Sequence, residues 1–387
     1  MSESGFRRKP WRVDWFEPEV ELTKTAKPCR SPEDYSEDVT LYFGDLHTHT
    51  NLSPCANLQA FFTSIEQSYE HARHTAQTDF VAITDHAEKL TSEQWAHSME
   101  LARTFNDPGR FIAWPAVEWA NGLHGHRNIY YRGYDAPLLT GQTHPTPRRL
   151  WAALRELDTP AFTIPHHAAK ELIADLTVTD DELEPAFEIF SVWGNSEYYG
   201  APWQDTDRCF TRNFAVDTLM RGFRMGFVGG GDGHAAPPAE SGITGIYARD
   251  LTLDALFEAV LQRRTFATTG AKIRVDFSVN GFPMGSVIRF NQHDVADLFP
   301  LEIGVGVQGT ANLEKVEIVE NGVTVYTKTK PRRLDQMGFV WRQGAMPANA
   351  RFNVPNNVSR FIYVRVTQRD GHMAWTSPIW LDFSYDE

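Results

Sequence analysis

The pattern of apolar and polar positions changes once along the chain, near residue 272. Before that point, short apolar runs alternate with segments in which apolar side chains recur every three or four residues, as at Ile65, Tyr69 and Ala72. The runs are typical of buried strands, and the recurring positions are typical of amphipathic helices. Strands are expected at residues 41–43, 79–84, 111–114, 128–131, 161–164, 187–190 and 226–229, and helices at 62–76, 92–105, 147–157 and 252–263. This alternation predicts an α/β fold in which helical crossovers connect the strands of a parallel sheet. The sheet is expected to be closed or nearly closed.

The last part of the chain has the alternation of a sheet with one buried face. Ile273 and Val275 alternate with polar residues, and residues 301–307 repeat the pattern. Asn321 and Gly322 form a hairpin signal between two further runs of this kind. We therefore expect a small antiparallel β-sandwich in this part of the chain.

Composition and charge narrow the classes of protein. The 387 residues suit two domains, or one large α/β domain with an appendage, and 42% apolar residues allow a packed core. The formal net charge of −13 disfavours long nucleic acid as a partner. Residues 1–38 are rich in proline and charge, which predicts an extended arm.

Cysteine usage and the lack of long apolar runs bear on location. Cys29, Cys55 and Cys209 are too few and too far apart for a disulfide framework, which favours a reducing compartment. The N-terminal residues lack the apolar stretch of a signal peptide, and no run approaches the ~20 residues that span a bilayer. We therefore expect a cytoplasmic protein with no membrane partner. The sequence leaves the oligomeric state open.

The histidines are concentrated in the first part of the chain. Of the 14 histidines, 12 lie between His47 and His234. Residues of the types that bind metals follow the ends of successive expected strands: His47 and His49, His86, Glu118, His166, then Asp232 and His234. In a β/α barrel the carboxyl ends of the strands meet on one face, where the catalytic loops lie. These side chains are therefore expected to converge.

The strongest local signal is His47-Thr48-His49. Side chains alternate along an extended segment, so both imidazoles point to the same face and can share one metal ion. Asp45 places a carboxylate on that face as well. The alternative is a pair of core histidines with internal partners. The surrounding motifs favour the metal interpretation.

A second strong signal is the glycine-rich run that contains Asp232 and His234. These two residues repeat the spacing of His47 and His49, and the glycines let the backbone approach a crowded centre. A loop that cradles phosphate is the alternative reading. It is disfavoured because the Gly-Lys-Ser/Thr ending of such loops is absent.

Two other positions are less certain from the residues alone. His86 is a candidate ligand, with Asp85 orienting one of its ring nitrogens. Glu118 lies in an apolar setting, where a buried carboxylate needs a partner. A metal or an arginine would satisfy it equally well.

Two histidine pairs leave a choice of ligand. His166 and His167 are adjacent and point apart, so one is expected to bind metal while the other lines the pocket or packs. His124 and His126 present a similar choice. His126 is the preferred ligand because it lies beside an expected strand.

Taken in order, these motifs resemble the polymerase and histidinol phosphatase (PHP) superfamily over roughly residues 40–270. Residues 44–50, 164–167 and 265–270 look like its PHP-like group of uncharacterised metal-dependent hydrolases. The resemblance implies a distorted seven-stranded β/α barrel with two or three metal ions. The expected organisation is an arm at 1–38, a PHP-like hydrolase barrel at 39–271 and an accessory β-sandwich at 272–387.

The resemblance also implies three ligand sets. They are His47, His49, Glu118 and Asp232 for a first metal, Glu118, His126 and His166 for a second, and His86, His234 and Cys55 for a third. Cys55 departs from the family, which commonly has histidine or a carboxylate there. A thiolate ligand would favour zinc or iron over manganese or magnesium; alternatively, the third site is weak or empty. We expect two or three divalent ions: zinc, manganese or iron.

The implied activity is that of a metal-dependent phosphoesterase acting on a small phosphorylated molecule. A hydroxide that bridges the metals would attack phosphorus, and His167 or His234 would protonate the leaving oxygen. Candidate substrate-binding residues are Arg127, Lys170, Glu197 and Arg208. The alternatives are a hydrolase of a carboxylic ester, lactone or amide, and a catalytically silent binding module.

Overall fold

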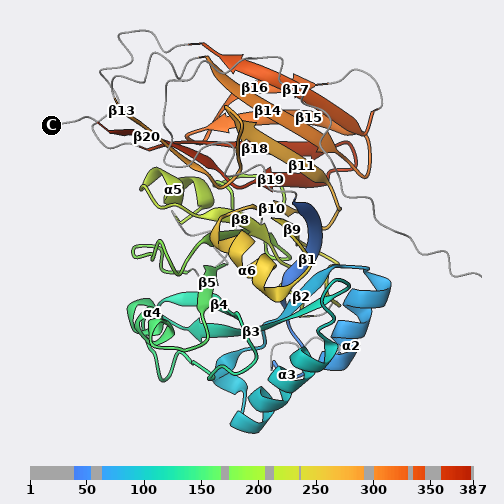
Figure 1. The fold of residues 1–387 in the computed structure, drawn as a ribbon, viewed down its shortest axis with the longest axis vertical. Coiled ribbons are helices and arrows are strands. Elements are labelled where there is room, and N and C mark those ends of the chain that lie inside the picture. Colours follow the sequence, from blue (N-terminus) through green and yellow to red (C-terminus); the bar gives the residue numbers. More distant parts are fainter. Residues whose placement is uncertain are drawn as a thin grey trace, which may run out of the picture.

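The computed structural model describes residues 39–53, 63–166, 174–204, 213–234, 237–291, 300–329, 334–344 and 359–384. The expected arm at 1–38 lies outside these residues. The protein is a mixed α/β structure in which strands predominate (Figure 1). Helices α2, α3 and α4 lie at one end of the molecule, and the strands of the C-terminal part lie at the other.

The first part of the chain forms the middle of a large mixed sheet. Strands β1 (Thr40–Thr48), β2 (Phe80–Ile83) and β3 (Ile112–Asn121) are parallel neighbours. Beyond β3 the sheet continues antiparallel through β4 (Gly125–Tyr131) and β5 (Ala161–Pro165). On the other side of β1 it continues antiparallel through β9 (Ile243–Ala248) and β10 (Thr265–Thr268).

A separate three-stranded sheet stands next to this one. It consists of β7 (Gly194–Asn195), β6 (Ala186–Ser191) and β8 (Gly226–Gly229), with β6 and β8 parallel. Strand β6 lies beside β5, and β8 lies beside β10. Among the described strands, no backbone ladder joins either pair, so the ladders do not close into a ring.

The expected parallel sheet with helical crossovers is therefore only partly formed. Among the described strands of the first part of the chain, parallel ladders join only β1, β2 and β3, and β6 with β8. Residues 122–124 connect β3 to β4, and so short a link can only turn the chain back antiparallel. The strands β9 and β10, which the apolar runs did not reveal, extend the sheet beyond β1 with two antiparallel pairings, β9 with β1 and β10 with β9.

The five described α-helices are α2 (Ile65–Glu70), α3 (Ser92–Phe105), α4 (Pro147–Arg155), α5 (Ala215–Met220) and α6 (Leu253–Leu261). Four of them begin after a residue whose side chain caps them, and α5 has no side-chain cap. Ser64 and Thr91 form capping boxes, and Thr252 accepts a hydrogen bond from Ala255 N as the expected N-cap of α6. A π-helical turn, His71–Thr75, continues α2, and a 3-10 turn, Ala87–Lys89, follows β2. No helix in the described ranges is both long enough and apolar enough to cross a bilayer.

The C-terminal part consists of two facing layers of sheet. One layer is β12 (Phe282–Pro283), β11 (Arg274–Val279), β14 (Leu301–Gln308) and β17 (Gln336–Gln343). The other contains β16 (Val323–Thr329), β15 (Leu313–Glu320), β18 (Arg360–Gln368), β19 (Met373–Thr376), β20 (Ile379–Ser384) and β13 (Val287–Asn291). Alternate residues such as Val275, Ile303 and Val316 are buried in the shared core.

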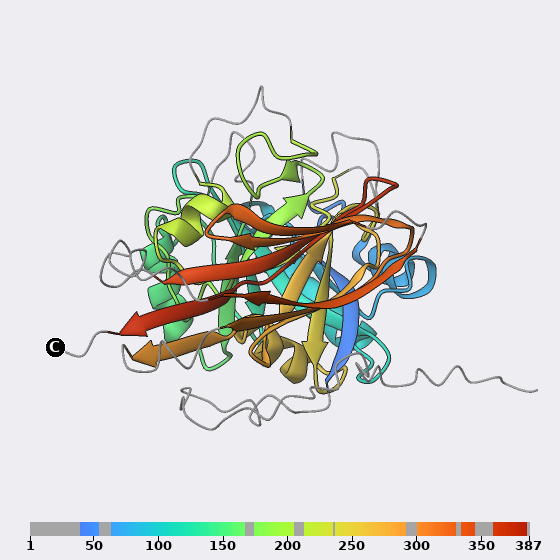
Figure 2. The same cartoon turned by 90° about the horizontal axis from the view of Figure 1, so that it is seen from above.

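The second layer is continuous with the large sheet of the first part. Strand β19 pairs antiparallel with β10, with Phe266 opposite Thr376. Seen from above, the orange and red strands of the C-terminal part lie over the blue-to-yellow elements of the first part (Figure 2). Because one sheet runs through both parts, the domain limits at residues 38/39 and 271/272 stay predictions.

Candidate metal centre

Strand ends and the loops that follow them bring one group of polar side chains together. Isolated bridges between Thr48 and Gly233 and between His86 and Glu118 hold these segments side by side. The group, here called the histidine cluster, contains His47, His49, His86, Glu118, His126, His166, Asp232 and His234. All eight are expected ligands; the ninth, Cys55, lies outside the described residues.

Glu118 lies at the centre of the cluster. Its Oε1 is 2.6 Å from His126 Nδ1 and 3.0 Å from His166 Nε2. Its Oε2 is 3.2 Å from His49 Nε2 and 3.4 Å from His86 Nδ1. One buried carboxylate therefore has four imidazoles within 3.4 Å, and His47 Nε2 lies 3.9 Å from its Oε2, which is the position of a bridging ligand.

Asp232 provides the second carboxylate. Its Oδ1 lies 3.2 Å from His49 Nε2, 3.5 Å from His47 Nε2 and 3.4 Å from His234 Nδ1. The residue adopts a left-handed backbone conformation with φ of 47°, and its N–H donates to the carbonyl of His47. That conformation is uncommon for a residue with a side chain and is typical of functional sites.

The glycines before Asp232 are required by close packing. A Cβ at Gly230 would lie 2.4 Å from Glu188 Oε2, and one at Gly231 would lie 2.5 Å from Asp45 Oδ2. Asp45 itself accepts hydrogen bonds from the backbone N–H groups of His47, Gly231 and Ala239. Its carboxylate therefore ties β1 to this loop instead of joining the cluster.

Hydrogen bonds determine which ring nitrogens face the cluster. His47 Nδ1 lies 2.8 Å from Glu188 Oε2, so it carries the proton and directs Nε2 toward Asp232. His49 Nδ1 lies 3.0 Å from Ser53 Oγ, and that hydroxyl donates to Asp85 Oδ1 at 2.6 Å. Because Ser53 donates to Asp85, it accepts from His49, and the lone pair of His49 is on Nε2.

Two of these positioning residues were not among the candidates from sequence. Glu188 lies in a buried apolar strand, and a carboxylate in such a run was a signal that it needed a partner. Ser53 had no signal of its own. Asp85 was expected to orient His86; in the structure it acts on His49 through Ser53, and it also accepts from Thr50 N and Oγ1.

Charge balance in the cluster suits metal binding. Burial raises the pKa of Glu118, but His86 and His126 outweigh it and hold that pKa well below its usual range. Burial lowers the pKa of His234 to about 4, with His49 adding to the effect, and burial also lowers the pKa of His86. Burial lowers the pKa of His47 and His126 as well, but Asp232 and Glu188 at His47 and Glu118 at His126 outweigh it and raise both pKa values. A divalent cation would take the place of the protons on these two imidazoles, because metal binding requires neutral histidines and an ionised carboxylate.

The donor atoms pass a test of fit for divalent ions. Four triplets of ligand atoms lie within 4.8 Å of one another: His49, His86 and His234; His47, His49 and Asp232; His47, Glu118 and His166; and His86, Glu118 and His126. His49 Nε2 and Glu118 Oε2 are buried and have no hydrogen-bond partner among the described residues. Buried polar atoms without partners are costly, and a shared cation would satisfy both.

Two expected substrate-binding residues, Arg127 and Glu197, do not belong to the histidine cluster. Arg127 is fully buried and donates to Glu184 Oε1 at 2.5 Å and to the carbonyls of His124 and Asp175. Its guanidinium is satisfied internally, so its assignment to substrate is wrong.

The structure also decides between two candidate metal ligands. His124 Nδ1 lies 2.9 Å from Asp175 Oδ2, so of the pair His124 and His126 only His126 joins the cluster.

Glu197 was also expected to line the substrate pocket, and that expectation is wrong. It is buried against the C-terminal sheet, where it accepts hydrogen bonds from Tyr363, Arg365 and Trp375. Burial of a carboxylate requires such donors, and they come from strands far along the chain. His167, Lys170 and Arg208 lie outside the described residues.

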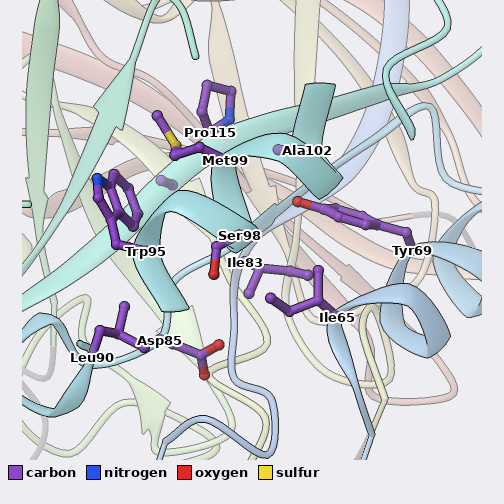
Figure 3. A pocket seen from close by; sticks show the side chains of 11 residues that line it. Ile65, Tyr69, Ile83, Asp85, Leu90, Trp95, Ser98, Met99, Ala102 and Pro115 are labelled. Carbon is purple, nitrogen blue, oxygen red and sulfur yellow. The ribbon is translucent and has the colours of Figure 1, made fainter. Parts of the chain in front are cut away.

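A small cavity that Asp85 helps to line lies near the cluster's positioning residues (Figure 3). Its lining is mostly apolar and includes Ile65 and Tyr69 from α2 and Trp95 and Met99 from α3. Its volume of about 10 Å³ has room for about one water molecule. It is therefore too small to be the substrate site.

Comparison with known proteins places the chain in a family. The model of the family described as "Protein of unknown function (DUF3604)" matches residues 75–221 and 229–286, which is more than half of the chain. The chain belongs to this family. It is 28% identical over 347 residues to an uncharacterized protein of Chlamydia pneumoniae and 31% identical over 361 residues to one of Chlamydia muridarum. Each match covers 83% of this chain and 55% of the relative, so the chain spans about half the length of these curated relatives.

Solved structures give weaker similarities. A two-domain protein from Bacteroides vulgatus containing a predicted PHP-like metal-dependent phosphoesterase has a TM-score of 0.42 at 12% identity, covering 89% of this chain and 95% of that one. PsfC from Pseudomonas syringae has a TM-score of 0.40 at 14% identity, covering 59% and 91%. Endonuclease Q in complex with a 27-mer duplex has a TM-score of 0.36 at 12% identity, covering 57% and 56%. These scores are too low to assign a function.

Proposed function

We propose that this protein is a metal-dependent hydrolase whose histidine cluster holds two or three divalent ions. The observation that carries the proposal is the convergence of six imidazoles and two carboxylates, with His49 Nε2 and Glu118 Oε2 buried and without a hydrogen-bond partner among the described residues. Imidazole and carboxylate ligands suit zinc, manganese and iron. The two or three ions and their identity are part of the proposal.

The chain's own residues prepare the ligands. Ions bound in the cluster would act as Lewis acids and lower the pKa of coordinated water, which is what hydrolysis at neutral pH requires. Glu188 holds His47 in one tautomer, and Ser53 with Asp85 holds His49 in the matching one. Protonation of the leaving group is assigned to a histidine that is not fully committed to metal, His167 or His234.

We propose a phosphate ester of a small molecule as the substrate. The ordered motifs that resemble the PHP superfamily favour this class over carboxylic esters, lactones or amides. Phosphate also calls for a cation beyond the metals. Because Arg127 is committed to Glu184, that role would fall to Lys170 or Arg208.

The same resemblance favours a distorted barrel. In the first part of the chain, the large sheet runs from β5 through β4, β3, β2, β1 and β9 to β10. Strand β6 contacts β5 at one end of this series, and β8 contacts β10 at the other end. We propose that this three-stranded sheet completes the barrel through side-chain contacts, with the cluster at its mouth.

Exposure of the ligands indicates where the substrate approaches. The side chains of His86, His126 and His234 are 18%, 10% and 10% exposed, whereas those of His47, His49 and His166 are fully buried. The ring of Trp193 lies edge-on to His234 with 5.7 Å between centroids. We place the substrate over this more open side, with Trp193 as a wall.

Release of inorganic phosphate from a panel of phosphomonoesters tests the proposal. Metal-loaded protein is compared with a chelated sample, and phosphodiesters are followed with a coupled phosphatase. Chelator-sensitive release supports a phosphoesterase. No release from protein shown to carry metal would reject this substrate class, and hydrolysis of carboxylic esters, lactones or amides by the same sample would identify the alternative chemistry.

A further inference from the structure

One loop connects the histidine cluster to the C-terminal sheet. It consists of residues 192–204, follows β6 and includes the short strand β7, and it is here called the junction loop. At its start, the backbone N–H of Val192 donates to the carbonyl of Gly231 at 3.1 Å, within the glycine-rich run of the cluster. The ring of Trp193 lies edge-on to His234, with 5.7 Å between the ring centroids. The start of the loop therefore lies at the proposed metal centre.

The rest of the junction loop is attached to the C-terminal sheet. Glu197 is fully buried, and its carboxylate accepts hydrogen bonds from three side chains of that sheet. They are Tyr363 and Arg365 on β18 and Trp375 on β19. Trp203 adds a second attachment, because its Nε1 donates at 3.2 Å to the carbonyl of Gly371, between the same two strands. Two attachments to one pair of strands restrict where the loop can lie.

Contacts within the junction loop join its two arms. The side chain of Gln204 donates to the carbonyl of Asn195 at 2.7 Å, and Asn195 N donates to the carbonyl of Trp203 at 3.2 Å. A Cβ at Gly194 would lie 2.5 Å from that same Trp203 oxygen, so the arms are in direct contact. A displacement of the loop at the C-terminal sheet would therefore be transmitted to its start at the cluster.

The chemistry of the attachment favours a single position of the loop. Stability alone does not require a buried ion pair, since well-packed apolar residues of similar volume often serve as well. A buried carboxylate with three donors instead favours one arrangement, because a shift would leave a charge or a donor unsatisfied. Arg365 is itself held in place, since it donates to Glu317 Oε2 at 3.0 Å and lies over the ring of Tyr198, 5.7 Å from its centroid.

We propose that the C-terminal sheet sets the position of the substrate wall: Glu197, through its three donors, holds the junction loop so that Trp193 stays against His234. Glu197 is a positioning residue in this arrangement and contacts neither substrate nor metal. The inference rests on the proposed function, in which Trp193 borders the substrate. It gives the C-terminal part of the chain a role in the hydrolase, that of a scaffold for substrate binding.

Fluorine NMR of the full-length, zinc-loaded protein labelled with 5-fluorotryptophan tests the positioning without any substrate. The chain has 11 tryptophans, and the variant Trp193→Phe identifies the resonance of Trp193. Glu197→Gln keeps the size of the side chain but removes its charge and one of its acceptor oxygens. We expect this variant to shift or broaden the Trp193 resonance.

Steady-state kinetics with p-nitrophenyl phosphate measure the consequence for the substrate. Glu197→Gln should raise KM about tenfold with little change in kcat, because a displaced wall removes binding that is equal in the ground state and the transition state. Metal content should stay unchanged, since Glu197 is not among the proposed ligands.

Glu320→Gln is the matched control in the same sheet. The carboxylate of Glu320 is also buried and accepts hydrogen bonds from Arg360 and Gln343. Neither donor belongs to the junction loop or to the three donors of Glu197. This variant should lower stability as well, but it should leave both the Trp193 resonance and KM unchanged.

The outcomes separate the positioning from the proposed function. An unchanged Trp193 resonance in Glu197→Gln would overturn the positioning, and so would an equal change in Glu320→Gln, which would indicate a general loosening of the sheet. If Glu197→Gln does not fold, Trp203→Phe replaces it under the same criteria, because Trp203 is 55% exposed and the substitution removes the donor to Gly371. A displaced Trp193 resonance with unchanged KM would support the positioning and reject Trp193 as a wall. If the wild-type protein has no phosphatase activity, the substrate class is rejected and the resonance alone decides the positioning.

Discussion

The protein contains two buried groups of charged side chains that differ in how they are satisfied. In the histidine cluster, Glu118 faces four imidazoles, and its Oε2 has no hydrogen-bond partner in the described part of the chain. Glu197, between the first part of the chain and the C-terminal sheet, accepts from Tyr363 at 2.6 Å, Arg365 at 2.7 Å and Trp375 at 2.8 Å.

The difference shows how a buried carboxylate can indicate its role. Burial raises the pKa of Glu197, while Arg365 and the two neutral donors act against it. The protein itself provides every donor that this carboxylate needs, so Glu197 stabilises the junction. Glu118 instead has partners that are themselves proposed metal ligands. A cation would be the missing partner there, which favours a binding role for the cluster and a stabilising role for Glu197.

The largest expected effect follows from removing a cluster ligand. His49→Ala should lower bound metal and reduce hydrolysis more than about 10⁴-fold, equivalent to ~5.5 kcal/mol, because His49 faces both carboxylates. Metal content by mass spectrometry and initial rates measure this. His74→Ala, at a side chain that is 65% exposed, is the matched control and should change neither. Full activity in His49→Ala would remove it from the site.

Substitutions that remove the donors to Glu197 should lower the stability of the fold without changing metal binding. Arg365→Ala leaves the buried Glu197 without its cation and Glu317 with Lys315 alone, and removing one partner of a buried pair costs about 3–5 kcal/mol. Denaturant unfolding measures the loss, while metal content per folded chain should be unchanged. Lys315→Ala, at a more exposed cation beside Glu317, should cost less than about 1 kcal/mol. A similar small cost for Arg365→Ala would contradict the comparison.

A smaller effect is expected from a residue that positions a ligand. Ser53→Ala removes the link between His49 and Asp85 and should weaken metal affinity about 10–100-fold. Competition with a chromogenic chelator gives the affinity. Thr50→Val provides a second test because Thr50 also donates to Asp85. Unchanged affinity in Ser53→Ala would mean that His49 is held by packing.

The smallest effect should come from removing one donor to Glu197. Tyr363→Phe deletes a single hydrogen bond to a charged group and should destabilise the protein by about 1.5 kcal/mol, because Arg365 and Trp375 remain. Denaturant unfolding measures this as well. A loss as large as that of Arg365→Ala would show that the three donors act as one unit.

The sequence by itself determined the local features of this protein. The alternation around Val275 and Ile303 places both in a buried core, and Thr252 begins α6 as its pattern indicated. Most of the cluster residues could be picked out because side-chain periodicity and metal-type residues at strand ends are local properties, whereas His166 was preferred to His167 through the resemblance to the PHP superfamily. Helix caps and apolar alternation depend on neighbours within a few positions, so they can be read along the chain.

Only the tertiary structure decided which partners the buried charges have. Glu188 orients His47 from 141 positions away, and Glu184 neutralises Arg127 from 57 positions away. The antiparallel course of β9 and β10, and the continuity of β10 with β19, likewise depend on pairing between distant segments. A buried charge must be satisfied by some partner, but its own sequence neighbours do not specify which one, because that choice is made when distant strands pack together.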